Sequence, residues 1–199
     1  MKSASFSLAF VIPFVIGCGA STPPAGTSAQ QAQAPVITAP VTTRQSDAAS
    51  STALLDGGEV FDGKTFKLKL PKGWIIKPEA LVALHAKATD AELFPNIKVA
   101  VLKPPAGATV AMVVNASMES YLKNGTVEEV TEIKLQGQPV HRMLMTQNLP
   151  GNLNRQLKYF IQTGPRVLVF TGQGTPETFE THLPLFEAVI RSLEVIPLP

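Results

Sequence analysis

The sequence predicts an α+β fold in which helices cover an antiparallel sheet, in the manner of an α/β/α-type sandwich. Several runs between residues 66 and 171 alternate apolar and polar side chains, which is typical of half-buried strands. Two other segments repeat apolar residues at three- and four-residue steps, which indicates helices with one apolar face. Because such helices and strands must bury their apolar faces against one another, a layered domain is expected.

The first part of this domain reads as short strands. Residues Phe66, Leu68 and Leu70 share one face, and Pro71-Lys72-Gly73 then turns the chain into Trp74. Two further runs each place their apolar residues on one face: Val82, Leu84, Ala86 and Ala88 in one, and Ile97, Val99 and Val101 in the other. We expect these strands to pair antiparallel.

A helix is expected next. Thr109 is a suitable N-cap, and Asn124-Gly125 is a usual stop signal. The residues on its predicted inner face are Val110, Val113, Val114, Ser117 and Tyr121.

Four strand-like runs joined by short turn signals follow, which predicts a meander. They are Glu128 to Leu135, Pro139 to Gln147, Asn154 to Thr163 and Arg166 to Thr171, and the turns are Gln136-Gly137, Pro150-Gly151-Asn152 and Gly164-Pro165.

The last element is a second helix, with Thr175 as cap and Pro176 at its first position. Its apolar stripe comprises Phe179, Leu183, Phe186, Ile190 and Leu193. Pro184 is expected to kink or restart it.

The first 17 residues have the pattern of an export signal. Lys2 supplies a positive start, and the apolar run from Phe6 to Ile16 is shorter than the roughly 20 residues that a membrane-spanning helix needs. An ordinary signal peptide that happens to contain a cysteine is the alternative. Cleavage at a small-x-small site would then be required, and no good one precedes Gly17.

The end of this segment, Val15-Ile16-Gly17-Cys18, resembles the bacterial lipobox. The resemblance implies cleavage before Cys18 and attachment of acyl chains such as palmitate to that cysteine. Each buried methylene contributes about 0.8 kcal/mol, so two or three chains hold firmly. Gly19 follows where an aspartate would favour the inner membrane, which implies an outer membrane, facing the periplasm, in a two-membrane cell.

Residues 18–53 then form a predicted linker after the lipidated cysteine. Almost all are Ala, Ser, Thr, Gln, Pro or Gly, with only Arg44 and Asp47 charged. Such a composition cannot build a core. We therefore expect three parts: a signal peptide at residues 1–17, the linker at 18–53 and a globular domain at 54–199.

Charge and cysteine content exclude several functions for the domain. Without Lys2 and Arg44 the 17 basic residues fall to 15, and without Asp47 the 15 acidic residues fall to 14. This balance gives no sign of nucleic-acid binding. Since Cys18 is the only cysteine, the domain has no disulfide, cysteine-ligated zinc, iron–sulfur cluster or cysteine nucleophile.

Three stretches of the domain resemble the PsbP-like fold, which a photosystem II extrinsic protein shares with DcrB-like and LpqN-like bacterial lipoproteins. They are residues Phe66 to Trp74, Pro95 to Val99 and Leu183 to Leu193. These are structural signatures, so the resemblance implies the fold but no catalytic or cofactor-binding residue.

A search for reactive groups finds only weak candidates. Of the histidines His85, His141 and His182, the first two lie in predicted strands and could meet across the sheet to hold a metal, although none has metal-motif spacing. The segment Thr171 to Thr175 resembles the start of a dinucleotide-binding loop. Glu177 stands where its third glycine should be, so we expect its glycines merely to relax a turn.

Charged clusters give no stronger signal. The acidic groups Glu128, Glu129 and Glu132, and more loosely Asp56, Glu59 and Asp62, lack calcium-loop spacing and are expected to be solvated. Three lysines, Lys67, Lys69 and Lys72, line one edge and could meet anionic headgroups. Serine hydrolysis has no visible nucleophile, because Ser117 and Ser120 fall inside a predicted helix.

These observations favour a membrane-anchored extracytoplasmic lipoprotein with a non-catalytic interaction or assembly domain that has an envelope protein as partner. We expect no catalytic residue, no metal site and no cofactor, and the sequence assigns no cofactor-binding residue. The alternative is a ligand- or metal-binding lipoprotein that uses His85 and His141 or the acidic cluster. An enzyme would need a carboxylate pair such as Asp90 and Glu92 in a cleft.

Overall fold

The computed structural model describes residues 53–149 and 151–196, which belong to one compact unit. The predicted signal peptide, the lipobox and nearly all of the linker lie outside the described residues. Among the residues that are described, no helix is long and apolar enough to cross a membrane.

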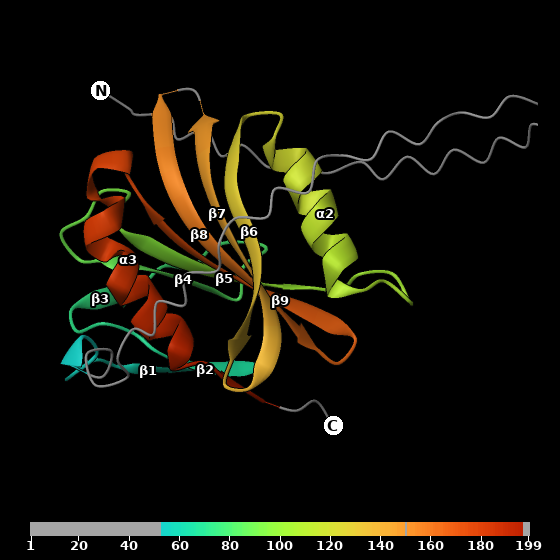
Figure 1. Cartoon of the computed structure of the whole chain (residues 1–199). Helices are drawn as coiled ribbons and strands as arrows, with labels where there is room; N and C mark the ends of the chain where they lie inside the picture. Colours follow the sequence, from blue (N-terminus) through green and yellow to red (C-terminus); the bar gives the residue numbers. More distant parts are fainter. Residues whose placement is uncertain (1–52, 150, 197–199) are drawn as a thin grey trace, which may run out of the picture. The chain divides into compact units, whose positions relative to one another are not determined.

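The domain contains one large and one small antiparallel sheet (Figure 1). The seven-stranded sheet has the order β3-β4-β5-β9-β8-β7-β6. Its strands are β3 (Trp74–Ile76), β4 (Leu84–Ala88), β5 (Asn96–Leu102), β6 (Gly125–Leu135), β7 (Gln138–Leu149), β8 (Asn152–Thr163) and β9 (Arg166–Gly174). The four strands β6 to β9 form the expected meander, and β5 pairs with β9.

The small sheet has the order β1-β2-β10. Its strands are β1 (Val60–Asp62), β2 (Phe66–Lys69) and β10 (Glu194–Val195). The predicted strand at Phe66 is confirmed, but it does not pair with the strands that follow it. It pairs instead with β1 and with the last strand of the described chain.

Two helices lie wholly within the described residues, α2 (Val110–Tyr121) and α3 (Pro176–Arg191), and they pack on opposite faces of the large sheet. On β8, Leu157, Tyr159 and Ile161 belong to the core cluster under α3, whereas Phe160 belongs to the cluster under α2. Because successive side chains of a strand point to opposite faces, the two clusters are separated by the sheet. Figure 1 shows α3 and α2 on either side of strands β6 to β8.

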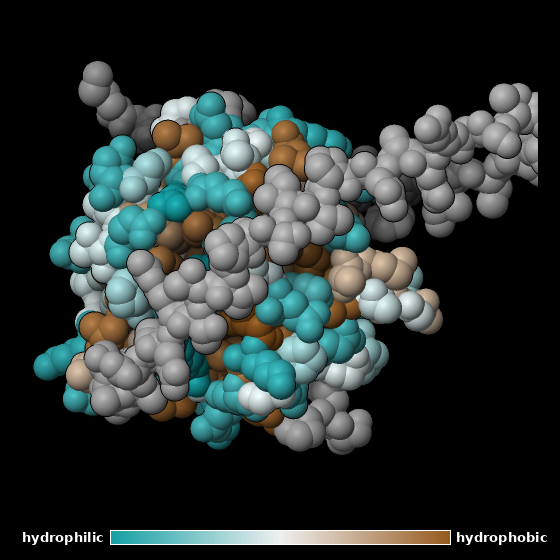
Figure 2. Space-filling model, viewed as in Figure 1, coloured by the Kyte–Doolittle hydropathy of each residue, from teal (hydrophilic) through white to brown (hydrophobic). Residues whose placement is uncertain are grey.

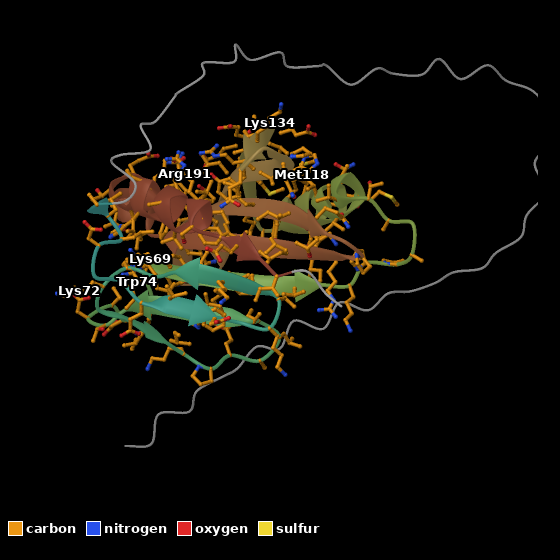
Figure 3. The ribbon with its side chains drawn as sticks, turned by 90° about the horizontal axis from the view of Figure 1, so that it is seen from below. Lys69, Lys72, Trp74, Met118, Lys134 and Arg191 are labelled. Atoms are coloured by element: carbon orange, nitrogen blue, oxygen red, sulfur yellow. The ribbon has the colours of Figure 1, made fainter. Side chains whose placement is uncertain are left out.

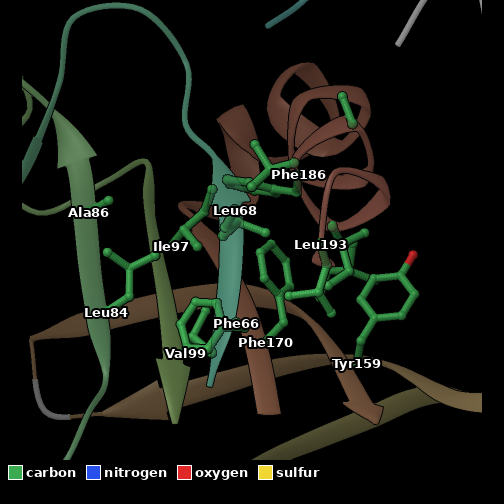
Figure 4. Packing of buried hydrophobic residues seen from close by; sticks show 14 of the residues in the cluster. Phe66, Leu68, Leu84, Ala86, Ile97, Val99, Tyr159, Phe170, Phe186 and Leu193 are labelled. Atoms are coloured by element: carbon green, nitrogen blue, oxygen red, sulfur yellow. The ribbon is translucent and has the colours of Figure 1, made fainter. Parts of the chain in front are cut away.

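The core under α3 is the larger one, and the small sheet completes it. Phe66 and Leu68 of β2 are buried there with Phe170 of β9 and Phe186 of α3 (Figure 4). The predicted apolar stripe of α3 is confirmed, since Phe179, Phe186 and Ile190 are buried. One face of the sheet is thus covered by a helix and a second sheet together.

Both helix starts are confirmed. The hydroxyl of Thr109 accepts the N–H of Met112, and that of Thr175 accepts the N–H of Thr178. Helix α2 ends at Tyr121 without the glycine stop that we expected. Gly125 instead opens β6, where a side chain would collide with the carbonyl oxygen of Thr146.

Helix α3 runs unbroken through Pro184, so the expected restart is wrong. Proline removes the hydrogen bond to the carbonyl of Glu180. Both residues are exposed, so that carbonyl is close to water and the helix continues.

Candidate functional site

The first polar arrangement of note joins the β3–β4 loop to the sheet. The carboxylate of Glu79 in this loop lies 2.6 Å from Nδ1 of His85 of β4 and accepts a hydrogen bond from the Nζ of Lys98 of β5 at 2.8 Å. The carboxylate thus holds the loop to two neighbouring strands. Burial lowers the pKa of His85, the positive charge of Lys98 lowers it further, and Glu79 opposes both.

His85 and Lys98 begin a line of polar side chains that crosses four strands. The strand register places His85 beside Lys98, Lys98 beside Thr171 and Thr171 beside Lys158. We call these four residues the polar row. They share the sheet face on which α2 packs, because their strand neighbours point into the core under α3.

A second line runs parallel to the polar row on the same face, displaced by two residues along each strand. It comprises Lys87, Asn96, Gln173 and Gln156. The Nε2 of Gln156 donates to the carboxamide oxygens of Asn154 at 2.6 Å and Gln147 at 2.8 Å. We call the two lines together with Asn154 the polar face.

Burial sets the polar face apart from the rest of the described structure. Five polar or charged residues are buried in the described part of the chain, and all belong to this face: Asn96, Asn154, Gln156, Lys158 and Thr171. Strand alternation alone would put apolar side chains there, as it does in the neighbouring cluster under α2. On β8, polar residues occur at positions that face α3 and at positions that face α2. This departure from simple alternation was the sequence signal for the polar face.

Lys158 is its most unusual member, because only 6% of its surface is exposed. Its Nζ donates to the hydroxyl of Thr171 at 3.1 Å and lies 4.9 Å from the ring centre of Tyr121 at the end of α2. None of the ion pairs within the described residues involves it. A buried cation without a carboxylate is costly unless another charge compensates it.

Two open cavities lie on the described surface, and one of them reaches His85 at the end of the polar row. One, of about 470 Å³, is lined by the β3–β4 loop and includes Ile76, Glu79 and His85. The other, of about 440 Å³, lies at the β8–β9 turn and includes Arg166 and Thr163.

His85 and His141, which the sequence left open as a metal pair, do not meet. They lie on β4 and β7, which are separated by three strands, or by about 19 Å at the usual spacing. The sequence pattern assigns each histidine to a strand, but it does not give the order of the strands in the sheet. Within the described residues, no three His, Cys, Asp or Glu side chains come together as metal ligands.

The acidic cluster is also divided. A register shift between Val127 and Glu129 places Glu128 against Arg155, at 2.6 Å, and Glu129 against Arg142, at 3.0 Å. Glu132 points to the other face of the sheet, where it lies opposite His141 of β7 in the strand register. The cluster is therefore not a single cation site. Asp90 and Glu92 are exposed in the β4–β5 loop and line neither cavity.

The glycines after Thr171 have a different role from the expected one. Gly172 and Gly174 lie within β9, which runs antiparallel to both neighbours. A Cβ on Gly172 would lie 2.5 Å from the ring of Phe186, so these glycines admit α3 rather than relax a turn.

The lysines of the small sheet are partly neutralised. Lys67 lies 2.9 Å from Asp62, and this hydrogen-bonded carboxylate raises the pKa of Lys67. Lys69 and Lys72 lie on the side of the small sheet, away from Lys134 (Figure 3).

Comparison with solved structures shows the fold. The domain is similar to cyanobacterial PsbP (CyanoP) from Synechocystis sp. PCC 6803, with 14% identity, a TM-score of 0.56, and coverage of 69% of this chain and 92% of that chain. This likeness confirms the expected PsbP-like fold.

Two other solved structures give lower scores. LpqN of Mycobacterium tuberculosis, described as involved in cell envelope biogenesis, has 13% identity, a TM-score of 0.49 and coverage of 71% and 87%. The Pseudomonas aeruginosa protein PA94, of unknown function, has 15% identity, a TM-score of 0.48 and coverage of 71% and 98%. No family model and no curated protein sequence matches the chain.

Proposed function

We propose that this protein is a lipoprotein, acylated at Cys18 and held in an outer membrane facing the periplasm, whose PsbP-like domain is a non-catalytic module that docks on an envelope protein. The anchor rests on the lipobox Val15 to Cys18, on the single cysteine and on the core-free composition of residues 19–53.

The docking role rests on one observation, the display of Leu81 at the tip of the β3–β4 loop. Its surface is 90% exposed, and its backbone is left-handed with φ of 69°. Both features are unfavourable for a leucine in an isolated domain. Ile76 nearby is 50% exposed, and Glu79 fixes the loop to β4 and β5. Because Glu79 fixes the loop, the side chain of Leu81 is presented in a defined position. Such a side chain can insert into an apolar pocket of a partner protein.

On the face seen in Figure 2, hydrophobic residues are scattered, and brown residues stand in several separate places among teal ones. The Leu81 loop therefore supports the docking role better than that face does.

The anchor is tested by labelling cells with an alkyne analogue of palmitate. The wild-type chain should carry the label and fractionate with outer membranes, and the Cys18→Ser variant should do neither. A Ser21→Ala variant serves as a control for the segment. Label retained by Cys18→Ser would contradict the proposal.

The docking role is tested by replacing Leu81 with a photoreactive amino acid in cells. A single crosslinked envelope protein is expected, and Leu81→Asp should abolish its co-purification with the chain. Leu153, which is 48% exposed and lies on β8, provides the control position. Identical crosslinks from both positions, or none from Leu81, would count against docking through this loop.

A ligand-binding lipoprotein is the second candidate. It is favoured by the polar face, whose buried amide, hydroxyl and ammonium groups are unusual for a purely structural sheet.

A further inference from the structure

We propose that the polar face binds a small phosphate ester that carries free hydroxyl groups, with Lys158 and Thr171 as the groups that hold its phosphate. This site is distinct from the Leu81 loop, so its test does not depend on a protein partner or on the anchor.

The charge of the polar face indicates an anion. It carries the ammonium groups of Lys158, Lys98 and Lys87, whereas Glu79 is the only carboxylate paired with any of them among the described ion pairs. Lys87 donates to backbone carbonyls rather than to an acid. Lys158 is buried and Lys98 and Lys87 are partly buried, so their attraction of an anion is screened less than it would be on an open surface.

The hydrogen-bonding capacity around Thr171 points to the same ligand. An ammonium has three N–H donors, and the only hydrogen bond described for Lys158 is to the hydroxyl of Thr171. That hydroxyl accepts from Lys158, so its own hydrogen is left to donate to a further acceptor. Phosphate oxygens are acceptors of this kind, and their hydrogen bonds to charged donors are strong.

The hydroxyl groups of the ligand are inferred from Asn96. Its Nδ2 donates to the carbonyl of Leu93 at 2.7 Å, but its Oδ1 is buried and has no hydrogen-bond partner. Within the described residues, Oδ1 of Asn96 is the one buried side-chain nitrogen or oxygen atom that has no hydrogen-bond partner. A buried acceptor without a donor is unfavourable. A hydroxyl of a ligand whose phosphate lies over Thr171 would supply that donor.

The strand register gives the site suitable dimensions. Lys98 and Lys158 lie on strands that flank Thr171, so their Cα atoms are about 10 Å apart at the usual spacing. Two long side chains from these positions can reach one phosphate from both sides. The side chain of Lys98 is 30% exposed and that of His85 18%, which makes the β4–β5 end of the row the point of entry.

The test measures thermal unfolding of the full chain, in detergent micelles with inorganic phosphate and with glycerol 3-phosphate, and after detergent removal in phosphatidylglycerol vesicles. A bound ligand raises the Tm by mass action. Phosphate also stabilises proteins generally, because it is excluded from their surface. Only the part of the Tm shift that is lost in Lys158→Met is therefore counted as binding.

Three variants isolate this part. Lys158→Met keeps the length of the side chain but removes its charge, and Thr171→Val removes only the hydroxyl. Lys134→Met changes an exposed lysine on β6 and is the matched control. Lys158→Met should raise the Tm without ligand, because it removes an uncompensated buried charge. It should lower the affinity for the phosphate ester at least tenfold, with a smaller loss for Thr171→Val and none for Lys134→Met.

The ligand arms distinguish the source of the phosphate ester. A shift with free glycerol 3-phosphate that Lys158→Met abolishes identifies a soluble ligand, and a shift with vesicles alone identifies a lipid headgroup. The proposal is overturned if no arm shifts the wild-type Tm beyond the general salt effect, or if Lys158→Met and Thr171→Val respond as the wild type does.

Discussion

The ring of Phe186 in α3 packs directly on the backbone of Gly172 in β9, so closely that a Cβ on the glycine would lie 2.5 Å from a ring carbon. A Cβ on Gly174 would likewise lie 3.2 Å from the Cα of Phe179. These two contacts set how closely α3 approaches the large sheet.

Gly172→Ala is therefore expected to destabilise the domain by about 1–3 kcal/mol, because overpacking forces the ring or the helix to move. Urea denaturation followed by tryptophan fluorescence of Trp74 measures the change. The double variant with Phe186→Leu should be less destabilised than the sum of its two single variants. Additive losses would mean that α3 accommodates the methyl group without strain.

A second prediction concerns the end of α3. The Nε2 of Gln136, in the β6–β7 turn, donates to the carbonyl oxygens of Arg191 at 3.0 Å and Leu193 at 2.9 Å. Gln136→Asn tolerates the left-handed backbone at this position but is too short to reach either carbonyl. We expect a loss of about 1–2 kcal/mol in the free energy of unfolding. Gln138→Asn, in an exposed residue nearby, should have almost no effect.

The Arg155 side chain joins the edge of the sheet to α3 and supports a third prediction. It pairs with Glu128 of β6 and Glu180 of α3 and lies over the ring of Phe179. Burial raises the pKa of Glu128, but hydrogen bonds from Arg155 and Thr146 outweigh it and leave the pKa below its usual value. Arg155→Met should cost about 1 kcal/mol at pH 7, given the partial exposure of these side chains.

The pH dependence checks this explanation. A carboxyl group whose pKa is lowered in the folded state stabilises the fold above its unfolded pKa, and this stabilisation is lost as the pH falls through the folded value. The difference between wild type and Arg155→Met should thus shrink below pH 4.5, the ordinary value for glutamate. Arg166→Met is the control, and a gap that stays constant down to pH 3 would exclude the charge effect.

The fourth prediction is that His85 titrates below its ordinary value of 6.5. Burial and Lys98 disfavour the charged ring, with smaller contributions from Lys87 and Lys77, whereas Glu79 favours it. NMR titration should give a midpoint that rises in Lys98→Met and falls in Glu79→Gln. The unfolded chain binds this proton more readily, so acidification below pH 6.5 destabilises the fold, and His85→Gln should remove that part of the pH dependence.

The sequence alone predicted the strands and helices whose patterns are long. Alternation identified most of the strands, and Thr109 and Thr175 marked the helix starts because capping is a local interaction. The strands β1 and β10 were missed, since runs of three and two residues are too short to show a period. They exist because β2 provides them with a partner.

The candidate site was not predictable for a different reason. Periodicity assigns a side chain to a face, but the pairing of β5 with β9 joins segments about 70 residues apart. Only that register brings Lys98 beside Thr171 and Thr171 beside Lys158. The possible metal site at His85 and His141 failed for the same reason. It required β4 and β7 to be adjacent, and three strands lie between them.

The pairing of β2 with β10 has a consequence for how the protein acquires its structure. Phe66 lies beside Val195, so the core under α3 closes only when both ends of the domain have met. Contacts between residues so distant in sequence slow folding, because a long loop must be ordered before they form. A chain that is still being synthesised or moved through a translocation channel lacks β10 and cannot complete this core. Such delayed closure would keep the chain unfolded for the export that we propose.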